Sequence, residues 1–292
     1  MFSKPYLKQR KSVLGHGGKS SNNRVVIYSS LFLLCALLLS LPSRAETVQV
    51  HGLDFGRILV HGSVDVEVSQ GDEPELVIRG KNSDLEQHPF FTDGDTLVLG
   101  RNQQHHSNFG NLKFKVTVVN LEQLQLHGSG DVYVKPLVVE DLYVSVDGSG
   151  DIKLFGVRGR SLILKVSGSG DIRAVTLDAE EVKLVVSGSG DLQIGELHAE
   201  WVKASLSGSG DIGVENGGTV MEMDINIVGS GAIDFEAVSA RIASVNIVGS
   251  GTVTLDVADE LDVNIMGSGE VMCHGSPDVS QSVLGSGEVH IK

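Results

Sequence analysis

The sequence is poor in the residues that staple small secreted domains or hold metals. Its 292 residues include 2 cysteines, 6 prolines and 1 tryptophan. So few cysteines exclude a disulfide framework and a cysteine-rich zinc module. The net charge of −14 argues against a nucleic acid partner, because binding phosphates needs clustered lysine and arginine. Glycine is abundant at 36 residues, but it has no three-residue period and little accompanying proline, so the chain is not collagen-like.

The first 45 residues have the pattern of an export signal. The segment 1–24 is basic and contains no acidic residue, an apolar run follows from Val25 to Leu41, and small residues lead to Ala45. This order predicts a signal peptide over 1–45, cleaved after Ala45, with Cys35 as one of its apolar residues. An uncleaved signal anchor is the alternative, because the basic part is long and the apolar run is near the lower limit for crossing a bilayer.

The chain beyond this segment is strongly acidic. Seven of the 23 basic residues lie in 1–45, which leaves 16 against 37 acidic residues and a formal charge of −21. The remaining segment also keeps a single cysteine, Cys273, so it can form no intramolecular disulfide. Its stability must therefore come from packing.

The glycines are concentrated in a Gly-Ser-Gly motif that recurs nine times. The intervals between copies are 20, 20, 20, 20, 21, 20, 18 and 18 residues. Such a period indicates a solenoid-type repeat architecture. The glycines of the first five copies are Gly128, Gly130, Gly148, Gly150, Gly168, Gly170, Gly188, Gly190, Gly208 and Gly210. The residues that follow the nine copies are Asp131, Asp151, Asp171, Asp191, Asp211, Ala232, Thr252, Glu270 and Glu288.

Within each repeat the apolar residues alternate, which is typical of strands. Leu162, Leu164 and Val166 precede one motif, for example, and Ile172 and Ala174 follow it. We therefore predict that each unit forms a strand, a tight corner and a second strand. A β-meander also fits alternation, but the same residue types return at the same phase in every unit. We therefore predict an all-β fold, a right-handed parallel β-helix with nine coils of about 20 residues that stack about 4.8 Å apart.

The corners explain the glycine excess. A corner that repeats in register needs a positive φ or a very close approach between coils, and glycine meets both demands without steric cost. The aspartate after each corner can accept hydrogen bonds from corner N–H groups, as in an Asx turn. We therefore expect these glycines and aspartates to have a structural role.

The sequence divides the rest of the chain into two segments. In 46–127 the alternation is less regular, around a degenerate corner at His61-Gly62-Ser63-Val64, and 96–99 and 114–119 read as later strands. A polar loop is expected over 102–108. We expect 46–127 to start and cap the solenoid, whose ends would otherwise expose open strand edges, and 128–292 to form the β-helix itself.

Four ordered segments carry a family resemblance. They are Val64–Asp72, Gly94–Leu99, Lys115–Val118 and Leu121–Leu124, the last leading into Gly-Ser-Gly-Asp-Val. Together they resemble the auto-transporter adhesin head domain, or GIN domain, of bacterial envelope proteins, over essentially 47–292. The resemblance implies an exported β-helical domain without an established enzymatic activity, and it supplies no catalytic residues. The last four coils depart from the pattern, because the aspartate is replaced there.

The polar residues allow several chemical alternatives. The aspartate row contains oxygen ligands of the kind that Ca²⁺ prefers, but calcium-binding β-rolls have a nine-residue period, so we interpret the row as corner capping and assign no cofactor. A carbohydrate-binding or polysaccharide-cleaving β-helix is the alternative function. The outward residues His127, Asp147, Lys165, Lys183 and Lys203 form only a scattered set, without the paired carboxylates of glycosidases. His105-His106 lacks further ligands at metal-binding spacing, so no metal site is assigned.

The outward residue before the corner changes character along the repeat. It is Asp147, Ser167, Ser187 and Ser207 in early coils, then Val228, Val248, Met266 and Leu284, with Asn226, Asn246 and Asn264 beside the last group. An exposed apolar stripe next to a row of amides is typical of a contact surface. We predict a self-association or partner-binding face there, unless C-terminal residues or a lateral loop cover it.

These observations together favour a non-enzymatic, exported cell-envelope protein that acts as a structural or adhesin-like binding module. The expected location is the periplasm, the outer surface or the medium. The expected partner is a second copy or an envelope component such as a glycan. Membrane contact is expected only through 1–45 if this segment stays uncleaved.

Overall fold

The computed structural model describes residues 46–102 and 109–292. The predicted export signal, with Cys35, and most of the predicted polar loop, with His105-His106, lie outside the described residues. In the part of the chain that is described, no helix is long and apolar enough to cross a membrane.

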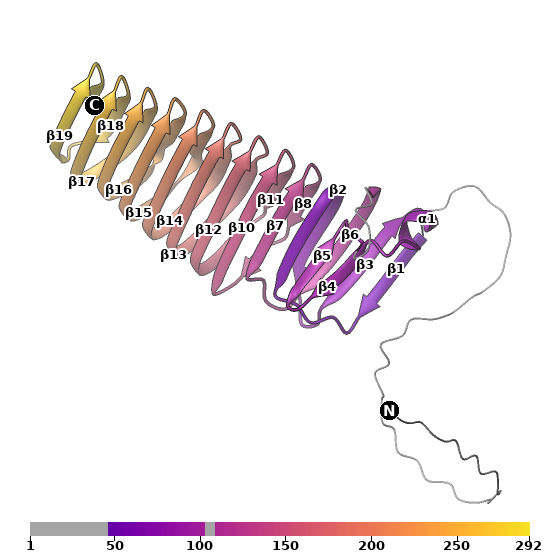
Figure 1. The fold of residues 1–292 in the computed structure, drawn as a ribbon. Coiled ribbons are helices and arrows are strands. Elements are labelled where there is room, and N and C mark those ends of the chain that lie inside the picture. The colour runs from indigo at the N-terminus through magenta and orange to yellow at the C-terminus, as the bar shows by residue number, and fades with distance from the viewer. Residues whose placement is uncertain (1–45, 103–108) are drawn as a thin grey trace, which may run out of the picture. The chain divides into compact units, whose positions relative to one another are not determined.

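Strands make up 76 % of the described chain, and the only helix there is one short turn (Figure 1). In chain order the elements are β1 (Glu46–His51), β2 (Arg57–Gln70), β3 (Glu75–Gly80), α1 (Asn82–Leu85), β4 (Phe90–Asp93), β5 (Thr96–Leu99), β6 (Gly110–Val118), β7 (Gln123–Gly128), β8 (Asp131–Val134), β9 (Leu137–Val138), β10 (Asp141–Gly148), β11 (Asp151–Leu154), β12 (Val157–Gly168), β13 (Ile172–Gly188), β14 (Leu192–Gly208), β15 (Asp211–Gly229), β16 (Ala232–Gly249), β17 (Thr252–Gly267), β18 (Glu270–Gly275), β19 (Asp278–Gly285) and β20 (Glu288–Ile291).

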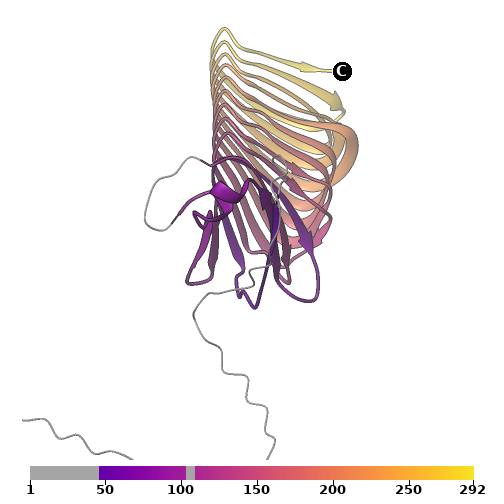
Figure 2. The ribbon, with the colours of Figure 1, turned by 90° about the vertical axis from the view of Figure 1, so that its right-hand side faces the viewer.

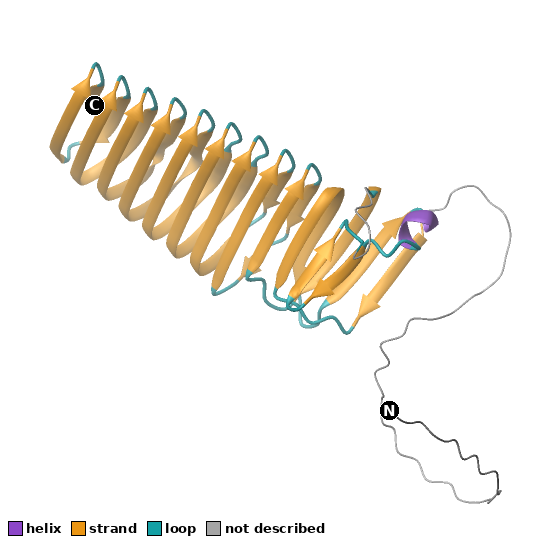
Figure 3. Cartoon of the chain, viewed as in Figure 1, coloured by secondary structure: helices purple, strands orange, loops and turns teal. Residues whose placement is uncertain are grey.

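From β7 onward each strand pairs in parallel with the strand one repeat further along the chain. Gly128 lies opposite Gly148, and the pairing of first corner glycines continues without a break to Gly285. The corners therefore form a row of short loops along one edge of a solenoid of about eight turns (Figure 3). The predicted parallel β-helix with coils of about 20 residues is confirmed. A β-meander is excluded, because neighbouring strands of a meander run antiparallel and these strands run parallel.

Each coil has three sides around an apolar interior. Along β13 the side chains alternate between inside and outside except at two places, where Val175-Thr176 and Glu180-Glu181 both face outward. Two successive outward residues require a bend in the chain, so these bends and the glycine corner divide the coil into three sides. Viewed along the stack, successive coils follow similar outlines (Figure 2). Inward positions of successive coils form buried columns, such as Val186, Leu206 and Ile227.

The corner geometry requires glycine for two separate reasons. Gly188 has a φ of +133°, and a Cβ atom at this position would lie 2.3 Å from the carbonyl oxygen of Gly168 in the preceding coil. That carbonyl accepts hydrogen bonds from the N–H groups of Ser189 at 2.9 Å and Gly190 at 3.1 Å. The backbones of successive corners are therefore in direct contact, and a side chain would separate them.

The N-terminal end of the solenoid has a different topology. β2 passes through the degenerate corner, so that His61 and Gly62 lie opposite His127 and Gly128. The other edge of β2 pairs in parallel with β5 and β6. Beyond them β3 pairs antiparallel with β6, β1 with β3, and β4 with β5. Antiparallel strands therefore cover this end of the parallel stack, and Leu85 of α1 contributes to the core.

Candidate contact surfaces of the solenoid

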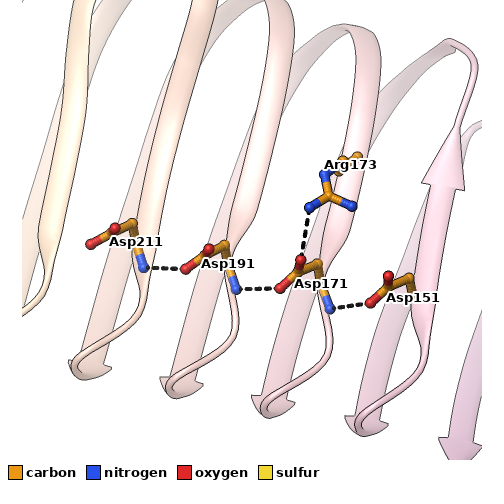
Figure 4. Close-up of polar contacts among 5 residues, drawn as sticks. All are labelled: Asp151, Asp171, Arg173, Asp191 and Asp211. Atoms are coloured by element: carbon orange, nitrogen blue, oxygen red, sulfur yellow. Dashed lines mark hydrogen bonds and ion pairs between the residues drawn. The ribbon is translucent and has the colours of Figure 1, made fainter. Parts of the chain in front are cut away.

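The corner aspartates form a hydrogen-bonded row between coils. The Oδ1 atom of Asp151 accepts the backbone N–H of Asp171 at 3.0 Å, and Asp171 and Asp191 accept the N–H groups of Asp191 and Asp211 at the same distance (Figure 4). The acceptor role expected from the sequence is present, but the donor belongs to the next coil. Each aspartate therefore links two coils instead of closing an Asx turn within its own corner.

The row ends where the aspartate is lost. Asp211 accepts the N–H of Ala232 at 2.9 Å, and Ala232 has no side-chain acceptor to offer the following coil. In the next coils the N–H groups of Thr252 and Glu270 donate instead to the carbonyl oxygens of Gly231 and Gly251, at 3.2 and 3.0 Å. A backbone acceptor replaces the carboxylate, which explains how the last corners stack without aspartate.

Close stacking of carboxylates affects their electrostatics. Burial, followed by the negative charges of Asp65 and Asp151, raises the pKa of Asp131 above its ordinary value of 3.8. Arg173 partly offsets the charge of the row, because its guanidinium donates to Oδ2 of Asp171 at 2.9 Å (Figure 4). No group of three or more histidine, cysteine, aspartate or glutamate side chains in the described segments is placed to hold a metal ion.

The apolar stripe predicted from the sequence stands on the outer face of β15, β16, β17 and β19. Val228, Val248, Met266 and Leu284 are paired in successive coils and are 56, 47, 57 and 68 % exposed. We call these four residues the contact stripe. The position before Val228 in the same column is Ser207, so the change from polar to apolar occurs between β14 and β15.

A column of amides runs beside the contact stripe. Asn226, Asn246 and Asn264 lie opposite one another in successive coils, followed by Ser282. The Nδ2 atom of Asn226 donates to Oδ1 of Asp224 at 2.7 Å, and Asp224 also pairs with Lys203. The surroundings of the stripe are therefore polar on this side, with uncharged amides closest to the apolar side chains.

The structure also contains an acidic groove that sequence reasoning missed. It has a volume of about 770 Å³, and Asp211, Gly213, Glu215, Asp234 and Glu236 are among its lining residues. β15 contains one residue more than the stretch of β14 that it pairs with, so the pairing register shifts between Ile194 and Glu196. This extra residue accounts for the single 21-residue interval between Gly-Ser-Gly motifs. The alternation of apolar and polar residues in the sequence does not reveal this groove, because the groove depends on a glycine at an outward position and on the local shift of register.

Among the residues that the structure describes, the remaining polar side chains form no compact catalytic arrangement. His127 lies opposite Asp147 and Lys183 opposite Lys203, whereas Lys165 lies opposite Val185 in a different column. The groove carboxylates are exposed, whereas a carboxyl group that acts as a general acid in glycoside cleavage is normally kept protonated by an apolar environment. Burial also raises the pKa of the Cys273 thiol, so it is a poor nucleophile.

The fold defines a class, a parallel β-solenoid, whose surface carries an exposed apolar stripe and an acidic groove. The family model described as "Putative auto-transporter adhesin, head GIN domain" matches residues 54–216 and 213–277, and this chain belongs to that family. The resemblance inferred from the sequence is therefore confirmed. Among curated proteins no match is found.

Solved structures of proteins from Parabacteroides species share the fold. A putative lipid binding protein from Parabacteroides distasonis is 30 % identical, with 86 % of this chain and 98 % of that chain covered and a TM-score of 0.63. A putative adhesin from Parabacteroides merdae is 21 % identical, with 86 and 97 % covered and a TM-score of 0.64. These proteins carry adhesin or lipid-binding names, not enzyme names, and the family supports a non-enzymatic binding module.

Proposed function

We propose that this protein is an exported, non-enzymatic, adhesin-like module of the bacterial envelope that binds a lipid surface through the contact stripe. The observation that carries the proposal is the exposure of Val228, Val248, Met266 and Leu284 in four successive coils, on a face that is polar in the preceding coils. A row of exposed apolar side chains is costly in water and typical of an interaction surface. The sequence analysis predicted membrane contact only through 1–45, and this proposal adds the contact stripe as a second place of contact.

The chemistry around the stripe favours a lipid surface without net charge. Uncharged Asn226, Asn246 and Asn264 lie next to it, and the segment 46–292 has a formal charge of −21, which repels anionic headgroups. The relative that is 30 % identical is named a putative lipid binding protein, which supports an apolar ligand. Burial of each half-exposed apolar side chain contributes about 1 kcal/mol, so four of them support weak, reversible binding.

The experiment is co-sedimentation with phosphatidylcholine vesicles. The triple variant Val228→Ser, Met266→Ser and Val248→Ser removes about 3 kcal/mol of apolar burial and should weaken vesicle binding about a hundredfold. Vesicles that contain anionic lipid should bind the wild-type protein less well than pure phosphatidylcholine, and added salt should reduce that difference.

The matched control replaces three apolar residues of similar exposure elsewhere, Val119, Val138 and Met221, with serine. This control should bind vesicles as the wild-type protein does. Equal loss in both variants, or wild-type binding by the stripe variant, would overturn the proposal. Retention on immobilised glycans without vesicle binding would favour the carbohydrate-binding alternative, and a change of particle mass without vesicle binding would favour self-association through the stripe.

A further inference from the structure

The two ends of the solenoid are finished differently. Antiparallel β1, β3 and β4 cover the first coils (Figure 1), whereas β19 at the opposite end pairs with β17 on one edge and, within the described residues, with no strand on the other. Val279 and Val283 are both 40 % exposed, although they continue the inward columns of Leu261 and Ile265, which are at most 2 % exposed. An open strand edge with exposed core residues is a template for pairing with another strand.

The sequence of this edge strand is symmetric about its centre. Residues 279–283 read Val-Ser-Gln-Ser-Val, with Gln281 in the middle. If a second, identical strand runs antiparallel about Gln281, Val279 meets Val283, Ser280 meets Ser282, and the two Gln281 residues meet each other. Each cross-strand pair within 279–283 therefore joins identical residues. Just outside this segment Asp278 falls opposite Leu284, so no two carboxylates face each other.

We infer that a second copy of this chain covers the outer edge of β19, so that two solenoids join end to end through an antiparallel β19 pair with its two-fold axis at Gln281. The interface is isologous, as in most homodimers. It continues the backbone ladder and buries the exposed inward valines of both copies against each other. The pairing uses the outer β19 edge of both copies, so assembly through this edge stops at two copies.

Gln281 itself fits this arrangement. Its register partner in the preceding coil is Val263, which follows Val245 in an inward column, so an amide occupies an interior position only in this last coil. At the axis the two amides face each other and can exchange hydrogen bonds, because an amide is both donor and acceptor. The interface consists of one strand pair and the apolar end of one coil, which places it at the low end of stable interface sizes and predicts a micromolar dimer.

The test places charges at Gln281, the one residue that lies opposite its own copy across the two-fold axis. The protein is purified in the form that the cell produces, with segment 1–45 cleaved or retained as it occurs. In lipid-free buffer, sedimentation velocity of this form should show dimers whose fraction rises with protein concentration. The variants Gln281→Lys and Gln281→Glu each place like charges opposite each other and should weaken dimerisation at least tenfold. An equimolar mixture of the two variants should restore dimers, because lysine then faces glutamate across the axis.

The mixture keeps the test decisive even if a charge disturbs the last coil, because a misfolded end would not be rescued by a partner. Gln87→Lys in the exposed end of the α1 region is the matched control and should dimerise as the wild-type protein does. A monomeric wild-type protein at high concentration, unaffected single variants, or an inactive mixture would overturn the inference. Gln281→Lys should still bind vesicles and the contact-stripe variant should still dimerise, so this inference and the proposed function fail independently.

Discussion

Gly188 and Gly94 both have a positive φ, but only Gly188 lies against another backbone. A Cβ atom on Gly188 would be 2.3 Å from a carbonyl oxygen, whereas one on Gly94 would meet nothing within 4 Å. Gly94→Ala should therefore cost about 1 kcal/mol of unfolding free energy through backbone strain alone. Gly188→Ala should cost about 3 kcal/mol or more, because two coils must also separate. Urea unfolding of both variants measures the difference, and equal losses would show that the corner relaxes freely.

Asp131 provides a pH-dependent prediction at the same scale. Burial and two neighbouring carboxylates raise its pKa in the folded state. Protonation therefore favours the folded state, and this contribution is present at low pH and lost as the pH rises through the raised pKa. Asp131→Asn, which keeps an acceptor oxygen without the charge, should melt at a higher temperature than the wild-type protein near neutral pH. The difference should vanish below the ordinary carboxyl pKa, and Asp131→Ala, which loses the acceptor, should not show the gain.

At the scale of elements, one coil contains a residue more than its neighbours. The pairing of β14 with β15 shifts by one residue after Ile194, around Glu215 and Asn216. Deletion of Asn216 restores the 20-residue interval and should change the unfolding free energy by no more than about 1 kcal/mol. Deletion of Glu196, an exposed residue of a regular coil, shifts Leu197 out of its inward column and should cost several times more. Thermal unfolding of the two deletions decides, and similar melting temperatures would contradict this account.

The sequence predicted the elements that repeat, together with β5 and part of β6, but it did not predict β3, α1 and β4 or how these elements are connected. Alternation and a constant period fixed the strand–corner–strand unit, because identical positions in successive coils must stack. No period marks 71–122, where the chain leaves β2, forms β3 to β6 on one edge and returns as β7 on the other. The contact stripe remains a prediction as a binding site, although its exposure is observed. The acidic groove arises from small side chains and one extra residue, which alternation does not encode.

At the scale of the whole solenoid, one coil is the unit by which the stack can be lengthened or shortened. Each coil pairs with the coil before it and the coil after it, and residues 20 apart occupy equivalent positions from Asp131 to Gly210. Deletion of residues 171–190 joins Gly170 to Asp191 with every column in phase, so this variant should unfold in one cooperative transition. Deletion of 181–190 alone brings unlike sides together and should abolish that transition. Circular dichroism during urea titration distinguishes the two, and loss of cooperativity in both would show that the coils are not interchangeable.

The hydrogen-bond ladder that joins successive coils also determines how the molecule responds to mechanical load. These bonds lie along the axis of the stack, so tension spread over a whole coil is shared by all the bonds beneath it. Tension on Lys292 alone loads them one after another, from the edge of the last coil. Each coil that detaches releases about 66 Å of extended chain and shortens the stack by only about 4.8 Å. A cell attached through such a molecule would therefore be held by a tether that lengthens in steps under force.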